Sequence, residues 1–247
     1  MFEGKKLICP ISGSTKFSKI FTIRKFPIYM GVVNKSKRFE FKQLTFNINK
    51  SSGSAQIHPK VPLKKLYFKP HGSGTVGMTW KNHHSSFFKF LSKDFKNLVI
   101  EIGGGHNSVS ESISLSGFKK NYKLISFDPN GKKYSNPNHF IVKDFFSKKY
   151  VKKYKDKISL VIHSHLFEHI YDPNNFLMDI NNSLKIGGLH IFNLPNLKFM
   201  IKNGYSNAMN FEHPYFLEES MIDYLLKKNG FKILKKRKYL NHSIFYK

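Results

Sequence analysis

The chain has 247 residues, a hydrophobic fraction of 40% and 25 Phe, so it can bury a full core and is not a disordered chain. It carries 42 Lys and Arg against 15 Asp and Glu, which gives a formal net charge of +27. A single cysteine, Cys9, excludes internal disulfides and any multi-cysteine zinc site.

The positive charge raises the question of a nucleic-acid partner, but the kind and spacing of the basic residues argue against one. Arg24, Arg38 and Arg237 are the only arginines, although phosphate and base recognition favours arginine, and the lysines are spread along the chain. We therefore interpret the charge as a solvated lysine surface and do not expect nucleic acid as the partner. A small anionic substrate is compatible with such a surface.

The start of the chain predicts neither a membrane segment nor a helical domain. Residues 1–10 lack the apolar core of a signal peptide, and no apolar run is long enough for a membrane span, so we expect a cytoplasmic protein. Short β-like runs cover residues 16–24, 26–33 and 39–48, with turns and prolines between them. We predict a small β-rich N-terminal lobe over residues 1–77.

A helix is predicted next, over residues 78–91, where Trp80, His84 and Phe87 recur at helical spacing. We place it against the following sheet, with His83 on the helix surface and His84 at the core edge rather than as metal ligands. The preceding glycine-rich residues 72–77 are either part of the site or a flexible linker, and the sequence leaves both open.

The stretch over residues 98–108 runs from an apolar strand into Gly103, Gly104 and Gly105, and a helix follows. Such a turn lets the backbone approach a ligand closely and directs free N–H groups towards it, as in nucleotide sites. Glu101 lies just before the turn. A second strand, 123–128, ends in Asp128, which is suitably placed to bind ribose hydroxyls.

From residue 98 onwards strands and helices alternate, which predicts a parallel sheet with right-handed crossovers. The predicted strands are 98–102, 123–128, 139–142, 160–164 and 190–194, followed by a final antiparallel pair over 231–235 and 241–246. The predicted helices are 108–116, 148–154, 174–184 and 218–229.

The glycine turn resembles the E-x-G-x-G-x-G loop of class I S-adenosylmethionine-dependent methyltransferases, with Glu101, Gly103 and Gly105 matching and Asn107 in the last glycine's place. Residues 159–173 resemble the family's fourth strand and its loop, h-h-x-x-x-x-h-E-H-h-x-D-P, through Glu168 and His169. Residues 184–188 resemble the L-K-P-G-G turn before its fifth strand. These landmarks occur in family order, which makes them specific together.

This resemblance implies an α/β fold, a Rossmann-like seven-stranded methyltransferase sheet over residues 78–247, with S-adenosylmethionine as cofactor. It implies a set of cofactor-binding residues, namely Glu101, Gly103, Gly104, Gly105, Asp128, Asp144, Phe145, Ser164 and His165. Asp144 and Phe145 would contact adenine, and Ser164 and His165 would line the methionine side. Asp144 has an alternative role as the cap of the following helix, and Glu168-His169 most often has a structural role.

The segment over residues 198–217 is too long for a simple turn, and it contains Asn210-Phe-Glu-His-Pro-Tyr-Phe. It resembles a loop of sugar methyltransferases in which a Glu-His pair precedes Tyr-Phe, and this implies Glu212 and His213 as catalytic residues. A neutral imidazole at His213 can take the proton of an acceptor hydroxyl. The alternative is that the pair only shapes the loop.

The first residues of the chain also resemble sugar C-methyltransferases, which begin with a C-P-x-C-G-S zinc knuckle. Here Cys9 is present but Ser12 replaces the second cysteine, so we expect no metal. The further C-terminal domain of the larger relatives is not found in this sequence, which weakens an assignment to carbon methylation.

The sequence therefore predicts methyl transfer to a small acceptor, a sugar or sugar-nucleotide hydroxyl in glycan biosynthesis. The alternatives are a methyltransferase acting on RNA or another macromolecule, and a non-catalytic protein that binds the cofactor. The absence of an Asn-Pro-Pro-Tyr type motif after residue 162 lowers the case for base N-methylation.

Overall fold

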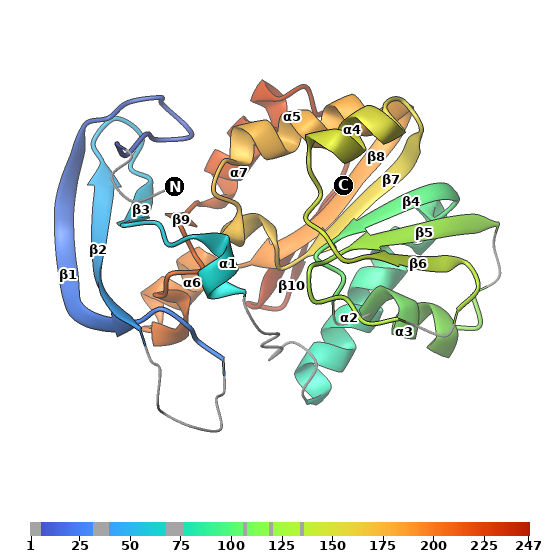
Figure 1. Cartoon of the computed structure of the whole chain (residues 1–247), viewed down its shortest axis with the longest axis horizontal. Helices are drawn as coiled ribbons and strands as arrows, with labels where there is room; N and C mark the ends of the chain where they lie inside the picture. The colour runs from blue at the N-terminus through green and yellow to red at the C-terminus, as the bar shows by residue number, and fades with distance from the viewer. Residues whose placement is uncertain (1–5, 32–39, 68–76, 106–107, 119–120, 134–135) are drawn as a thin grey trace. The chain divides into compact units, whose positions relative to one another are not determined.

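The computed structural model describes residues 6–31, 40–67, 77–105, 108–118, 121–133 and 136–247 (Figure 1). The chain divides into two compact units, each assembled from three segments. The first unit comprises Met1–His71, Glu168–Asn174 and Asn196–Lys228, and the second comprises Gly72–Phe167, Asn175–Pro195 and Asn229–Lys247. Asn107 and the glycine-rich residues 72–76 lie outside the described residues.

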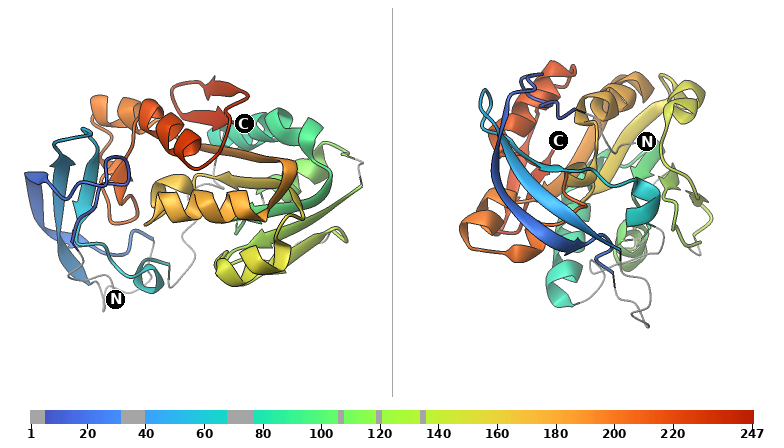
Figure 2. Two further views of the ribbon diagram at one scale, coloured as in Figure 1. Left: turned by 90° about the horizontal axis from the view of Figure 1, so that it is seen from above. Right: turned by 60° about the vertical axis from the view of Figure 1, so that its left-hand side comes forward.

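The first unit is built on a four-stranded antiparallel sheet with the order β1-β2-β3-β9. Its strands are β1 (Phe17–Pro27), β2 (Phe41–Asn49), β3 (Ala55–His58) and β9 (Tyr215–Phe216). The expected β-rich N-terminal lobe is confirmed, although β1, a curved ribbon in Figure 2, runs from the predicted strand at 16–24 only into the first two residues of the one predicted at 26–33. Register shifts after Lys19 and Ile23 let it bend without ending, and it stops at Pro27.

Helical segments of the first unit are α1 (Leu63–Leu66), α6 (Leu197–Lys202), a 3-10 turn at Ser206–Ala208 and α7 (Glu219–Lys228). Its core joins strand and loop residues, since Leu44, Ile57 and Phe211 are fully buried in one cluster. The Phe46 and Phe216 rings lie 5.6 Å apart. Buried Phe211 therefore anchors the long loop that carries Glu212 and His213.

The second unit contains a seven-stranded sheet with the order β10-β11-β8-β7-β4-β5-β6. Its strands are β4 (Asn97–Ile102), β5 (Tyr122–Phe127), β6 (His139–Val142), β7 (Ile158–Ser164), β8 (Leu184–Pro195), β10 (Lys236–Tyr239) and β11 (Ser243–Tyr246). The neighbouring strands β8, β7, β4, β5 and β6 run parallel to one another, and β11 runs antiparallel to β8. The predicted parallel sheet with a final antiparallel pair is confirmed, but the strand predicted at 231–235 was misplaced, because β10 lies at Lys236–Tyr239.

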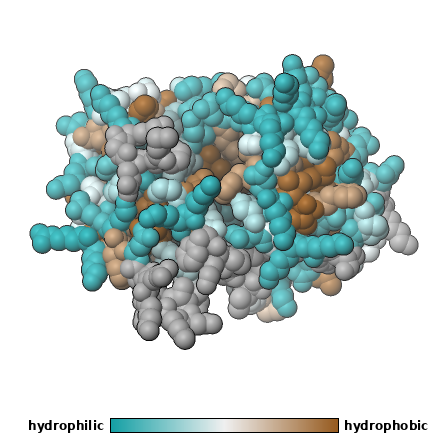
Figure 3. Space-filling model, viewed as in Figure 1, coloured by the Kyte–Doolittle hydropathy of each residue, from teal (hydrophilic) through white to brown (hydrophobic). Residues whose placement is uncertain are grey.

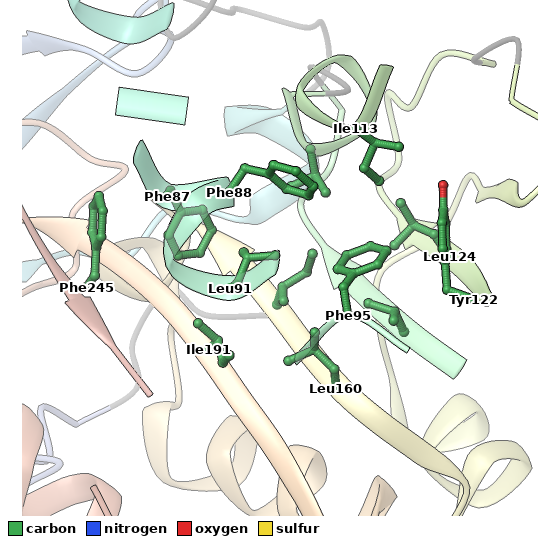
Figure 4. Close-up of a cluster of buried hydrophobic side chains, with 13 residues drawn as sticks. Phe87, Phe88, Leu91, Phe95, Ile113, Tyr122, Leu124, Leu160, Ile191 and Phe245 are labelled. Atoms are coloured by element: carbon green, nitrogen blue, oxygen red, sulfur yellow. The ribbon is translucent and has the colours of Figure 1, made fainter. Parts of the chain in front are cut away.

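Helices cover both faces of this sheet: α2 (Met78–Leu91) and α3 (Ser108–Leu115) on one, α4 (Lys148–Tyr154) and α5 (Pro173–Ser183) on the other (Figure 1). The strands are buried on both faces because alternate residues pack in opposite directions. Val99, Leu124 and Leu160 face α2 and α3, whereas Ile100 and Ile125 face α4 and α5. Figure 4 shows Phe87, Phe88 and Leu91 of α2 packed over the strands.

One placement in α2 was wrong. His83 is fully buried and His84 only partly, because the helix turns His83 towards the sheet with Phe87. On the face shown in Figure 3, hydrophilic side chains are spread widely rather than gathered in one patch. Among the described residues, no helix has the length and apolar character that a membrane span requires.

Candidate functional site

The glycine turn after β4 is shaped by close contact with two acidic side chains of the second unit. Gly103 has a φ of +77°, a left-handed conformation that favours glycine. A Cβ atom on Gly104 would lie 2.3 Å from Glu101 Oε2, and one on Gly105 would lie 2.6 Å from Asp128 Oδ2. Both distances are shorter than real Cβ contacts, so a side chain at either position would displace the neighbouring carboxyl group.

Glu101 is the last acidic group of β4 and is buried beneath this turn. Burial raises the pKa of its carboxyl to about 7, although the hydrogen bond from Ser126 works in the opposite direction. Near neutral pH the side chain is therefore divided between its charged and protonated forms. A ligand with positive charge would shift it towards the carboxylate.

A buried chain of hydrogen bonds supports Glu101 and was not predicted from the sequence. The Ser126 hydroxyl on β5 donates to Glu101 Oε2 and lies 2.8 Å from Nε2 of His139 on β6. Since the Ser126 proton points to Glu101, the hydroxyl accepts from Nε2, which leaves Nδ1 of His139 to accept from Ser110. Burial lowers the pKa of His139 to about 4 and keeps the ring neutral.

Asp128, directly after β5, is held by backbone amides. Its Oδ2 accepts the Gly105 N–H at 3.0 Å, and its Oδ1 accepts the Asn130 N–H at 2.7 Å. Each carboxylate oxygen has two lone pairs, so the side chain can order the turn and still accept from hydroxyl groups of a ligand.

Asp144 follows β6 and is engaged with α4. It accepts hydrogen bonds from the Phe145 N–H at 2.8 Å, Lys149 Nζ at 2.8 Å and the Tyr150 hydroxyl at 2.9 Å. The bonds from Lys149 and Tyr150 lower its pKa. Asp144 is not the N-cap of α4, a position that Ser147 holds, and it contacts α4 through the side chains of Lys149 and Tyr150 instead. The adenine contact of Asp144 and exposed Phe145 stays a prediction.

Ser164 and His165 lie at the carboxyl end of β7. The Ser164 hydroxyl contacts the side-chain amide of Asn193 on β8. His165 has a φ of +48°, and its N–H donates to the Asn193 carbonyl at 3.1 Å. Its ring lies against Trp80 and His83 of α2.

The first unit brings together two predicted motifs that lie far apart in the sequence. Glu168, His169 and His213 each place one potential ligand or proton-transfer atom within 4.8 Å of the others. We call Glu168, His169 and His213 the Glu168 cluster. Glu168 is buried, as is the neighbouring Glu212, and burial raises the pKa of Glu168.

Backbone carbonyls orient both imidazoles of the Glu168 cluster. Nδ1 of His213 lies 2.7 Å from the Ala208 carbonyl oxygen, and Nδ1 of His169 lies 2.9 Å from that of Glu212. A carbonyl only accepts, so both Nδ1 atoms carry a proton, and the neutral form of each ring has its lone pair on Nε2. Nε2 of His169 is 3.9 Å from Glu168 Oε1.

Asn210 is a loop-shaping residue whose role was missed from the sequence. Its Oδ1 accepts the N–H groups of Glu212 at 2.7 Å and His213 at 3.2 Å. An Asn two residues before a pair of polar residues is the signal of such an Asx turn. The carbonyl of Glu212 is thereby positioned for His169.

Comparison with known proteins assigns this fold to a class. Residues 82–236 match the family described as "Methyltransferase domain", and this is more than half of the chain. The chain therefore belongs to this methyltransferase family, and the predicted enzyme class is confirmed. No curated protein matches the chain.

Solved structures support the fold. An S-adenosylmethionine-dependent methyltransferase from Aquifex aeolicus is 13% identical with a TM-score of 0.52, covering 65% of this chain and 87% of that one. A candidate methyltransferase from Bacillus halodurans is 14% identical with a TM-score of 0.50, covering 63% and 71%. These likenesses confirm the predicted Rossmann-like methyltransferase fold.

Proposed function

We propose that this methyltransferase transfers a methyl group from S-adenosylmethionine to a hydroxyl of a small acceptor, with a sugar or sugar nucleotide as the acceptor class. The observation that carries the acceptor chemistry is the Glu168 cluster, in which carbonyl-oriented imidazoles keep their Nε2 lone pairs beside a buried carboxyl group. Family membership supports the methyl transfer, and the Aquifex protein of the same fold is described as S-adenosylmethionine-dependent.

The second unit's glycine turn fits the cofactor. Gly104 and Gly105 have no Cβ, which lets the backbone of the turn lie directly against the carboxyl groups of Glu101 and Asp128. Asp128 keeps lone pairs for the ribose hydroxyls, and Glu101, whose pKa is about 7, becomes fully ionised near the positive charges of the cofactor. When bound, S-adenosylmethionine supplies an electrophilic methyl group on a sulfonium.

His213 is the proposed general base. Methyl acceptance by a hydroxyl requires loss of its proton, and Nε2 of neutral His213 takes that proton. The resulting imidazolium keeps its Nδ1–H bond to the Ala208 carbonyl. Glu168 as a carboxylate stabilises this positive charge. The interaction with His213 in turn lowers the pKa of Glu168 and so opposes the effect of burial.

A half-buried lysine of the first unit, Lys60, supports an anionic acceptor. Lys60 Nζ donates to the Tyr171 carbonyl at 3.1 Å and the Tyr215 hydroxyl at 2.5 Å. Burial lowers its pKa to about 8, so binding of an anion would favour its charged form. Tyr215 belongs to the Tyr-Phe pair of the sugar-methyltransferase resemblance.

The test is a turnover assay with methyl-labelled S-adenosylmethionine and a fractionated cell extract. We expect label in the nucleotide-sugar or glycan fraction. Label in RNA would replace the acceptor class with a macromolecule, and cofactor binding without any labelled product would support a non-catalytic protein. Failure of the folded protein to bind the cofactor in isothermal titration would contradict the proposal as a whole.

A variant tests the base. His213→Gln should lower turnover about 100-fold, as expected for loss of a general base, while the cofactor dissociation constant stays unchanged. His58→Gln, a half-buried histidine of the same unit, is the matched control and should retain turnover. Equal turnover of the two variants would remove His213 from the mechanism.

A further inference from the structure

A second cluster of imidazoles lies wholly within the second unit. It consists of His83 on α2, His165 directly after β7, and His242 in the turn before β11, and we call it the three-histidine cluster. One ring nitrogen from each lies within 4.8 Å of the others. Ser243 pairs with Pro195 at the end of β8, so the cluster lies at the carboxyl edge of the parallel strands.

The spacing of the rings suits a single metal ion. The centroids of His83 and His165 lie 5.1 Å apart, those of His83 and His242 5.1 Å, and those of His165 and His242 5.4 Å. Three imidazoles that bind one tetrahedral zinc ion through nitrogens at about 2.0–2.1 Å have centroids roughly 5 Å apart. Packed aromatic rings reach similar distances, so the inference needs a further observation.

His83 supplies that observation. It is fully buried, and within the described part of the chain neither of its ring nitrogens has a hydrogen-bond partner. An unpaired buried imidazole is costly, since its polar atoms lose water without replacement. An imidazole binds a metal in its neutral form, through a ring nitrogen that carries no proton.

The other two imidazoles are held in place by their surroundings. The buried Ser243 hydroxyl contacts Nε2 of His165 at 3.2 Å and Nδ1 of His242. A hydrogen bond to one nitrogen that orients the other is the usual outer shell of a metal-bound histidine. The left-handed backbone of His165 is rare for a residue with a side chain and points to a functional constraint on its ring.

We propose that His83, His165 and His242 bind one zinc ion. Three neutral nitrogen ligands without a carboxylate favour zinc over magnesium or calcium, which take oxygen ligands. Three protein ligands leave a fourth position for water or a ligand oxygen, as in catalytic zinc sites. The inference does not depend on the methyl-transfer reaction.

The experiment is a zinc titration of the full chain, purified without a histidine tag and stripped with a chelator, against a chromophoric competitor. We expect one equivalent of zinc to bind the wild type and cobalt to give the visible absorption of a tetrahedral site. His83→Phe and His242→Leu should each weaken zinc binding at least 100-fold. His84→Gln, the neighbour of His83 on α2, should leave the affinity unchanged.

The Glu168 cluster is the competing location, because its three ligand atoms also lie within 4.8 Å of one another. His213→Gln therefore serves as the second control and should retain the zinc affinity. Loss of zinc binding in His213→Gln alone would overturn the proposal, as would equal affinities of the wild type and His83→Phe, or no binding by the wild type.

A melting curve separates a ligand role from a packing role. His83→Phe keeps a ring against Tyr239 and Phe245 and removes the unpaired nitrogens, so its metal-free form should melt no lower than the wild type. Zinc should raise the melting temperature of the wild type and not of this variant. A zinc-induced rise of equal size in both proteins would contradict the assignment.

Discussion

The backbone N–H of Gly105 donates to the carboxylate of Asp128 at 3.0 Å. This bond joins the turn after β4 to the residue after the neighbouring parallel strand β5. The register of these strands places Glu101 opposite Ser126, whose hydroxyl donates to Glu101. The two acids and the turn are therefore ordered by the protein itself, which lowers the cost of ordering them on ligand binding.

Gly104→Ala should weaken cofactor binding. The added methyl group would lie 2.3 Å from Glu101 Oε2 and must displace that buried carboxyl group. We expect the dissociation constant for S-adenosylmethionine, measured by isothermal titration, to rise at least about 10-fold, which is about 1.4 kcal/mol. Gly53→Ala is the control, since its positive φ costs stability but no neighbouring atom is displaced. Unchanged affinity in Gly104→Ala would show that the turn does not bind the cofactor.

Glu101→Gln should change how stability depends on pH. The folded pKa of Glu101, about 7, exceeds its ordinary value of 4.5, so its stabilising effect is present below pH 4.5 and lost as pH rises through 7. As the pH increases from 4.5 to 7, the free energy of unfolding of the variant should rise by up to about 3 kcal/mol relative to that of the wild type. Urea unfolding at pH 5 and pH 8 measures the change. A pH-independent difference would mean that the buried carboxyl group does not titrate in this range.

Asn210→Ala should disturb the Glu168 cluster without touching the cofactor. It removes the acceptor of two buried N–H groups, those of Glu212 and His213, at a cost of about 1–3 kcal/mol of stability. We expect about 10-fold slower turnover and an unchanged cofactor dissociation constant. Asn203→Ala, which loses one exposed bond to Phe199, should behave as the wild type. Full turnover in Asn210→Ala would show that this loop does not position a catalytic group.

The buried pair of His163 and His190 should make the protein sensitive to acid. Their Nε2 atoms lie 2.9 Å apart, and burial lowers the pKa of His190 to about 3 and that of His163 well below its ordinary value. Below pH 6.5 both imidazoles take up a proton in the unfolded chain, whereas in the folded chain they stay neutral. The free energy of unfolding is therefore highest above pH 6.5 and falls as the pH decreases.

Replacing both histidines by Leu tests this origin. The slope of unfolding free energy against pH between 5 and 6.5, measured by urea unfolding, should fall by up to about 2.7 kcal/mol per pH unit, the effect of two protons. His58→Leu, which replaces a histidine outside this pair, is the control for the substitution itself. An unchanged slope in the double variant would assign the acid sensitivity to other groups.

Patterns that are local in sequence predicted the elements of the second unit well. Three successive glycines after an apolar run predict a tight turn because glycine tolerates both a left-handed backbone and close approach. Gly103 has the left-handed backbone, and Gly104 and Gly105 have the close approach. The alternation of apolar runs and helical patterns predicted the parallel sheet. The positions of β1 and β10 were less accurate, since bulges and strand ends depend on partner strands.

Side-chain partners depended on tertiary structure. The helical spacing in α2 placed His83 on the surface, but the direction from which the sheet packs against α2 buries it. The link from Ser126 to His139 requires the register of β5 and β6.

The sequence by itself determined the methyltransferase fold and the glycine turn with its two acids, because both follow from short-range spacing and backbone stereochemistry. Only the tertiary structure decided which histidines share a site. It brings His213 to Glu168 and His169, and it brings His242 to His83 and His165. Residues so far apart in the chain meet through strand order and core packing, which no local pattern encodes.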